Sequence, residues 1–202
     1  MSMIHTKFAA SLMSLQMPSG TKVMLTENSI IHDARNRMVL RALEDGYDTI
    51  LWLDSDMTFD PDLLVRLQKD AETRDFVTAL TFSRTLPTSP VLCEDIIWEP
   101  QGEYVKHEAV RMTAYPRDQI FEIGGCGSAA CIVRTEIYEQ MVDRFHCAPY
   151  EPLQHLGEDY SFCWRLKQMG VKMYCDSSIK TGHIGQIPIT EYIYESQGPR
   201  NG

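Results

Sequence analysis

The sequence predicts one α/β domain, in which helices flank a mostly parallel β-sheet to give three layers. Helix patterns and strand patterns alternate from residue 4 to residue 80, as they do in such domains. Residues 49–53 read TILWL, an unbroken apolar run that is typical of a strand covered on both faces. The 202 residues are 44% hydrophobic, which suffices for one core. We therefore expect a single domain over residues 1–202, with a loosely packed tail from about residue 188.

The individual elements follow from apolar spacing and from residues that start or stop helices. Helices are expected over residues 4–15, 29–45, 61 onward, 135–143 and 158–169. Ser29 and Asp60 are the expected caps of two of them, and Gly46 and Gly170 the expected stops. Strands are expected over residues 22–26, 49–53, 76–80, 129–133 and 171–175. The Pro-rich stretch 83–118 is expected to form loops and edge hairpins around a binding cleft.

Charge and composition narrow the possible partners. The formal net charge is −9, which argues against nucleic acid and against an anionic membrane surface as partners. An anionic ligand would therefore need a metal ion or a local group of donors. No apolar run is long enough for a membrane span, and the six cysteines form no CxxC pair. We expect buried, reduced thiols and a cytoplasmic protein.

The strongest chemical signal is the triplet Asp54-Ser55-Asp56, directly after the 49–53 strand. Ligands of open α/β sheets bind beyond the carboxyl ends of strands. Two carboxylates at this place can converge on Mg²⁺ or Mn²⁺, which prefer oxygen ligands. The alternative is a turn in which an Asp only caps a loop, but the strand before and the expected helix after favour the metal site.

Two further motifs supply candidate catalytic and metal-binding groups. Glu158 and Asp159 open an expected helix, where the helix dipole alone would favour them. Asp159 is also a candidate general base, with Glu158 as its neighbour or as an acceptor ligand. His183, flanked by Gly182 and Gly185, is a candidate third metal ligand, although a lone His is more often structural.

The remaining candidates are glycines and arginines. The cluster Gly124-Gly125-Cys126-Gly127-Ser128 would let a sugar approach the backbone closely, or it forms a tight hairpin. Arg35 would reach a phosphate or orient an aspartate, and Arg84 has a similar role. For both arginines a surface position is an equal alternative.

Five segments in this order resemble the GT-A-type glycosyltransferases, and most closely the small bacterial and phage-type members related to inverting family 2. They are HDARNRMV, ILWLDSDMTF, GGCGSAACIVR, GEDYSFCWRLKQMG and TGHIG, and the resemblance covers roughly residues 4–186. It implies a Rossmann-like sheet, a Mn²⁺ or Mg²⁺ cofactor and a UDP-sugar or GDP-sugar donor.

The resemblance also implies a role for each matching residue. Asp54 would contact the ribose or the metal, Asp56 would bind the metal that bridges the diphosphate, and His183 would be a further metal ligand. Asp159 would be the catalytic base. The segment 125–128, with Gly125, would border the donor sugar and the acceptor.

The sequence departs from the resemblance at its start, because the usual first strand of that fold is missing and the chain opens in the following helix. We expect a transferase that moves a sugar to a hydroxyl acceptor. Because Asp159 offers a general base, inversion at the sugar is favoured over retention, which is the alternative. A homo-oligomer in which a partner subunit supplies a strand is one way to fill the gap. The alternatives are a metal-dependent nucleotidyltransferase and a catalytically inactive protein that only binds.

Overall fold

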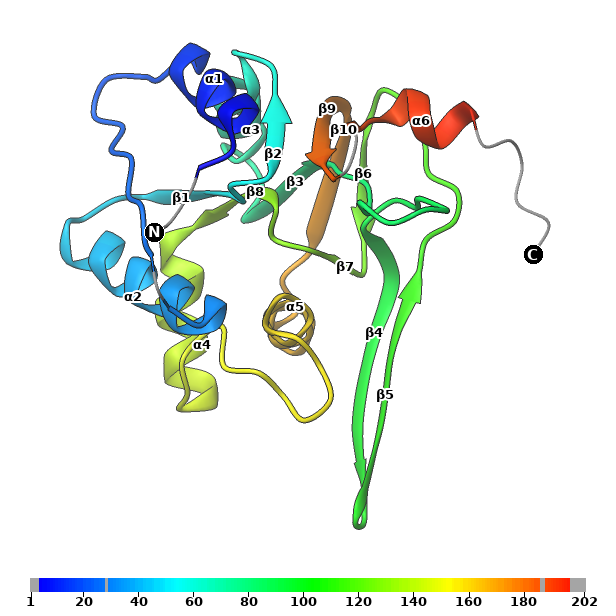
Figure 1. Cartoon of the computed structure of the whole chain (residues 1–202). Coiled ribbons are helices and arrows are strands. Elements are labelled where there is room, and N and C mark those ends of the chain that lie inside the picture. Colours follow the sequence, from blue (N-terminus) through cyan, green and yellow to red (C-terminus); the bar gives the residue numbers. More distant parts are fainter. Residues whose placement is uncertain (1–3, 28, 186–187, 197–202) are drawn as a thin grey trace.

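The computed structural model describes residues 4–27, 29–185 and 188–196. Its main sheet has the strand order β1-β8-β3-β9-β10, and β2 and β6 also pair with β9 (Figure 1). These strands are β1 (Thr49–Leu53), β2 (Met57–Phe59), β3 (Phe76–Leu80), β6 (Ile120–Ile123), β8 (Ala130–Arg134), β9 (Met173–Ile184) and β10 (Pro188–Ile189). In the described part of the chain, β1 has a strand neighbour on one side only.

The sheet is mixed and mostly antiparallel, so the prediction of a mostly parallel, Rossmann-like GT-A-type sheet in three layers is wrong. Among the described strands only β3 and β9 pair in parallel, and the other pairs are antiparallel. The reason is the path of β8, which inserts between β1 and β3 and runs opposite to both. An apolar run reports that a strand is covered on both faces, and it carries no information about strand direction.

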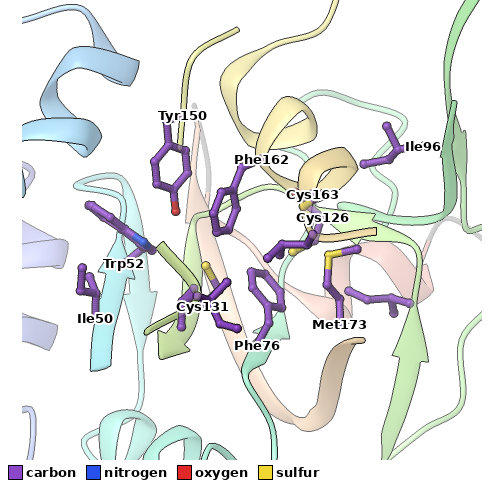
Figure 2. Close-up of a cluster of buried hydrophobic side chains, with 14 of the residues drawn as sticks. Ile50, Trp52, Phe76, Ile96, Cys126, Cys131, Tyr150, Phe162, Cys163 and Met173 are labelled. Carbon is purple, nitrogen blue, oxygen red and sulfur yellow. Dashed lines mark hydrogen bonds between the residues drawn. The ribbon is translucent and has the colours of Figure 1, made fainter. Parts of the chain in front are cut away.

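Helices cover both faces of the sheet, and each face has its own core. The six described helices are α1 (Thr6–Ser14), α2 (Ile31–Glu44), α3 (Leu63–Asp70), α4 (Thr135–Phe145), α5 (Glu158–Met169) and α6 (Glu191–Ser196). The larger core joins the sheet to α2, α4 and α5, and Figure 2 shows its aromatic centre around Tyr150 and Phe162. The smaller core joins the sheet to α1 and α3 through Phe8 and Leu67.

A second, three-stranded sheet stands apart from the first. It consists of β4 (Leu92–Gln101), β5 (Tyr104–Arg111) and β7 (Gly125–Cys126), in the order β5-β4-β7. β4 and β5 form a long hairpin arm that extends away from the main sheet (Figure 1). The expected edge hairpin between residues 83 and 118 is therefore present. Its strands have 10 and 8 residues, which is long for a Pro-rich stretch.

Several helix ends follow the sequence and others do not. α5 ends at Gly170, whose φ of 76° is the left-handed conformation that glycine adopts without strain. The caps of α2 and α3 are Ile30 and Asp62 instead of Ser29 and Asp60. Residues 22–26, expected as a strand, have no strand partner in the described chain.

The end of the described chain is held against the larger core. Ile193 and Tyr194 pack on that core, and Tyr115 donates a hydrogen bond to Glu191 at 2.9 Å. Residues 197–202 of the expected tail lie outside the described residues. All six cysteines are free and five are buried. Across the described ranges, no helix has the length and apolar character that a membrane crossing requires.

A candidate active site at the end of strand β1

The chain turns sharply after β1, and both aspartates lie in this turn. The backbone N–H of Asp54 donates to the carbonyl of Ala129, just before β8, at 3.0 Å, and the carbonyl of Asp54 accepts from the N–H of Met57 at 3.1 Å. The chain then enters β2, whose Met57 lies opposite His183 of β9. Asp56 is fixed in place because its carbonyl accepts the N–H of Ile184 at 2.7 Å. The turn thus places Asp56 beside β9 and leaves Asp54 above the larger core.

Arg35 of α2 links two carboxylates that are far apart in the sequence. Its Nη2 lies 3.1 Å from Oδ1 of Asp54 and 3.6 Å from Oδ1 of Asp159. Its guanidinium lies 5.1 Å from the ring centre of Trp52 and 5.6 Å from that of Tyr150, distances typical of cation–π contacts. The residue is only 4% exposed, so it is a buried clamp and not the surface arginine of the alternative reading.

Burial and charge shift the pKa values in this clamp in opposite directions. Burial raises the pKa of Asp54 to about 6, and the nearby Asp159 and Asp56 add to this, while Arg35 opposes it. Burial alone would lower the pKa of Arg35, but the carboxylates of Asp159 and Asp54 outweigh it and hold that pKa above its usual range. Arg35 therefore stays charged, and its positive charge opposes the rise in the pKa of Asp54.

Asp56, His183 and Arg84 form the second half of the site. Oδ2 of Asp56 lies 3.2 Å from Nε2 of His183 and 2.7 Å from Nη1 of Arg84. The hydrogen bond from His183 lowers the pKa of Asp56, and Arg84 adds to this. The same hydrogen bond raises the pKa of His183 against the effect of burial. Arg84 is mostly exposed, with 60% of its side-chain surface accessible.

The hydrogen bonds of His183 determine which of its two ring nitrogens carries the proton when the ring is neutral. Nδ1 lies 2.8 Å from the carbonyl oxygen of Phe82, and because a carbonyl only accepts, Nδ1 must carry a proton. In the neutral ring, the Nε2 lone pair would then face the Asp56 carboxylate. Two arrangements remove this repulsion, namely a protonated imidazolium or a cation shared by Nε2 and the carboxylate.

The start of α5 brings the other two candidate carboxylates to the site. Oδ1 of Asp159 is buried and has no hydrogen-bond partner among the described residues, since 3.6 Å from Arg35 is too long for one. A methyl group added at Gly127 would lie 3.6 Å from Oδ2 of Asp159, so the glycine-rich segment borders this carboxylate. Burial, and then Asp159, raises the pKa of Glu158.

Packing accounts for the missing side chain of Gly125, whose role as a donor-binding residue stays a prediction. A Cβ at this position would lie 2.4 Å from Cδ1 of Ile96 and 3.2 Å from Cβ of Cys163. The missing side chain is thus required by packing between β4 and α5. Gly127, two residues later, is the glycine that faces a functional group.

Sequence reasoning missed the aromatic residues that support Arg35. Trp52 donates a hydrogen bond from Nε1 to the hydroxyl of Tyr138 at 2.8 Å, and the hydroxyl of Tyr138 lies 3.3 Å from that of Tyr150. Tyr150 stacks on Phe162 of α5 with ring centres 4.5 Å apart. These residues lie far apart in the sequence and read as ordinary core, so no local signal marks them.

The donor set fits a divalent cation only in part. In residues 4–27, 29–185 and 188–196 no group of three or more His, Cys, Asp or Glu side chains is arranged to hold a metal ion. Asp56 and His183 offer two donors on a common face. Mg²⁺ is commonly held by one or two protein carboxylates, with water and substrate phosphates as the other ligands. The residues therefore fit a cation whose remaining ligands come with an anionic substrate.

Comparisons with known proteins show a fold and no family. No protein-family profile matches the sequence, and no curated protein sequence matches it either. The crystal structure of A197 from STIV matches with a TM-score of 0.54 and 20% identity, over 81% of this chain and 72% of that one. The chain shares its fold with A197 from STIV. At this identity the likeness to A197 concerns the fold alone.

Proposed function

We propose that the chain is a metal-dependent glycosyltransferase, which moves a sugar from a UDP-sugar or GDP-sugar to a hydroxyl acceptor. The observation that carries the proposal is the meeting of four separate elements at one place. Asp54 and Asp56 follow β1, Arg35 comes from α2, Asp159 from α5, and His183 from β9. Asp54, Asp56, Arg35 and His183 thus gather near Asp159, which Gly127 borders. A turn that only stabilises the fold does not need so many charged or titratable groups, and such clusters are typical of functional sites.

Asp56 and His183 are the proposed holders of Mn²⁺ or Mg²⁺. Nε2 of His183 and the Asp56 carboxylate lie 3.2 Å apart, and with the neutral ring a shared cation would make both groups favourable donors. When bound, the cation would supply Lewis-acid stabilisation of the negative charge on the leaving diphosphate. Asp54, fixed by Arg35 at 3.1 Å, would bind the ribose or complete the cation's ligands.

Asp159 is the proposed general base. Its carboxylate would take the proton of the acceptor hydroxyl while that oxygen forms a bond to the anomeric carbon and the bond to the diphosphate breaks. Its Oδ1, which has no hydrogen-bond partner among the described residues, and the missing side chain at Gly127 beside its Oδ2 support this role. Glu158, whose pKa is raised, would be a neighbouring ligand of the acceptor.

The arginines would divide the remaining work. Arg35 is buried and paired with two carboxylates, so its proposed role is to position them. Arg84 is exposed and bound to one oxygen of Asp56, so it can leave that oxygen and pair with a phosphate. A cytoplasmic location is part of the proposal, supported by the six free cysteines.

One observation favours a second candidate, a catalytically inactive protein that binds an anionic sugar derivative. Each aspartate of the triplet is already paired with a basic group, Asp54 with Arg35 and Asp56 with Arg84 and His183. In such a protein these pairs would be structural. No comparable observation favours a nucleotidyltransferase.

The deciding experiment measures binding of UDP and GDP with Mn²⁺ and with EDTA. A ligand at one hundred times its Kd stabilises the fold by about 2.7 kcal/mol, which raises the Tm by roughly 5–10 °C in a chain of this size. We expect this rise with Mn²⁺ present and its loss in EDTA or in Asp56→Asn. Asp60→Asn, an exposed acid a few residues further on, is the matched control. Nucleotide binding that ignores EDTA would refute the metal site.

Product analysis with the variant Asp159→Asn separates the candidate activities. Removing a general base lowers the rate by about 10²–10⁴, whereas donor binding should stay unchanged. Release of a nucleoside diphosphate identifies glycosyl transfer, and release of pyrophosphate from a nucleoside triphosphate would identify nucleotidyl transfer. Donor binding without turnover in the unaltered chain, across a panel of acceptors, would favour the inactive candidate.

A further inference from the structure

Strand β1 exposes an unused row of backbone hydrogen-bonding groups. In its antiparallel pair with β8, Asp54 donates to Ala129, and the carbonyl of Asp48 accepts from Thr135. Hydrogen-bonded pairs alternate along such a ladder, so the residues between these two ends alternate as well. The N–H and C=O groups of Thr49, Leu51 and Leu53 must therefore point away from β8. No described residue is a hydrogen-bond partner of these groups.

A cavity of about 460 Å³ lies along this open edge. β1 forms one wall through residues 49–53, and the extended segment 17–25 forms the opposite wall. Phe8, Leu12 and Leu64 close one face, and Met38 and Ala42 close the other. The cavity therefore contains the open edge itself and has apolar walls above and below it.

The segment 17–25 is fixed as a wall and does not pair with β1. Gln16 donates to the carbonyl of Pro61 at 2.7 Å, and Thr21 donates to that of Pro18 at 3.1 Å. Nζ of Lys22 forms an ion pair with Asp45 at 2.6 Å. Val23 and Leu25 line the cavity and are 46% and 65% exposed, so part of its apolar wall is open to solvent.

We propose that this cavity binds a short, extended, apolar peptide segment of another chain, which adds to β1 as a new edge strand. Outward N–H and C=O groups that recur at every second residue match another extended backbone better than any compact ligand. Side chains of an added strand would point alternately to the two faces of the sheet, and both walls of the cavity are apolar there, so these side chains should be uncharged. At about 3.4 Å per residue, the edge of β1 accommodates some five residues.

The first test uses a synthetic peptide and isothermal titration calorimetry with the full chain. The probe is acetylated and amidated, has a core of alternating Val and Thr, and carries a lysine at each end for solubility. We expect saturable binding. In one probe, every second residue is N-methylated so that the N–H groups facing β1 are lost, and binding should weaken about tenfold or more. In a second probe, the residues between them are N-methylated, which leaves the N–H groups facing β1 intact and should have little effect.

Amide hydrogen exchange then locates the peptide. In the free protein, the amides of Thr49 and Leu51 should exchange faster than those of Ile50 and Trp52, and the peptide should slow them. If these two amides are already protected in the free protein, the edge is covered by the chain itself or by a second copy, and the proposal fails. Equal binding of both N-methylated peptides would also overturn it.

A variant of the edge provides the matched comparison. Thr49→Pro removes an outward donor at the first position of an edge strand, where proline is tolerated, and should weaken peptide binding severalfold. Leu40→Ala, at a position that is 60% exposed and does not line the cavity, should leave it unchanged. Unchanged peptide binding in a folded Thr49→Pro variant would contradict strand addition at β1.

Discussion

Arg35 is the residue on which the charge balance of the site depends. It is buried, lies over two aromatic rings and pairs with Asp54 and Asp159. Its removal would leave two carboxylates in a setting where one of them already has its pKa raised to about 6 by burial. Buried charges without a partner are among the most destabilising changes in proteins.

We expect Arg35→Met to lower the free energy of unfolding by about 3–5 kcal/mol near neutral pH. The loss should depend on pH. Without Arg35 the folded-state pKa of Asp54 rises further above its unfolded value. A group with a raised folded pKa loses its contribution to stability as pH rises through that pKa. The destabilisation should therefore be larger at pH 8 than at pH 5, as measured by urea unfolding.

The matched control for this prediction is Arg41→Met on the same helix. Arg41 has 58% of its side-chain surface exposed and pairs with Asp45 and Glu44. Exposed pairs contribute about 0–1 kcal/mol, so its loss should be small. Equal destabilisation by both variants would show that Arg35 acts through helix α2 and not through the buried carboxylates.

At the scale of elements, β7 packs against β4 and α5 so closely that a side chain does not fit. Gly125→Ala would place a methyl group 2.4 Å from Cδ1 of Ile96, and overpacking of this kind costs about 1–3 kcal/mol. Ile96→Val removes that atom and should recover part of the loss in the double variant. Gly157→Ala, with no atom within 4 Å of the new methyl, should be close to neutral. Thermal unfolding of the four variants measures all of these effects.

The contact of α3 with β9 predicts a second pH effect, away from the site. Burial, and then Asp176, raises the pKa of Asp70 to about 6, and Oδ2 of Asp70 is buried without a hydrogen-bond partner in the described chain. Because the folded pKa is raised, the contribution of Asp70 to stability is present at low pH and is lost as pH rises through about 6.

Asp70→Asn should therefore stabilise the fold at pH 8, and the gain should shrink as pH falls toward 4. Urea unfolding at three pH values provides the measurement. Asp62→Asn, at an exposed position beside the start of the same helix, serves as the control. A gain for Asp70→Asn that is the same at every pH would mean that its ionisation is not the cause.

At the scale of the whole molecule, the centre of stability is the pair β3 and β8. All five residues of β3 are buried, and four of the five in β8. β8 lies between β1 and β3, so its hydrogen bonds open only when the sheet opens. The hairpin arm projects from this body (Figure 1), and most residues of β5 are exposed.

Native-state hydrogen exchange should resolve this difference. Amides of β3 and β8 should exchange only through global unfolding, whereas amides of β5 should exchange through local opening at a lower free energy. Exchange measured in low urea concentrations distinguishes the two routes. Equal protection of β5 and β3 would mean that the arm and the sheet unfold as one unit.

The sequence by itself determined most of the helices and strands, and it placed the candidate carboxylates just after the end of a strand. The run 49–53, the strand 76–80 and the helix 158–169 are strands and a helix with these bounds. Local patterns suffice here, because periodicity and end residues report burial and helix limits directly. The position of Asp54 and Asp56 beyond a buried strand also follows from the sequence.

Tertiary structure alone decided strand direction, the partners of each charge and the role of the glycines. The insertion of β8 made the sheet mostly antiparallel, and the register of β2 on β9 placed His183 against Asp56. Arg35 became a buried clamp because Trp52 and Tyr150 support it. Each of these facts joins residues distant in the chain, and a local pattern records how buried a residue is without recording which residue lies opposite.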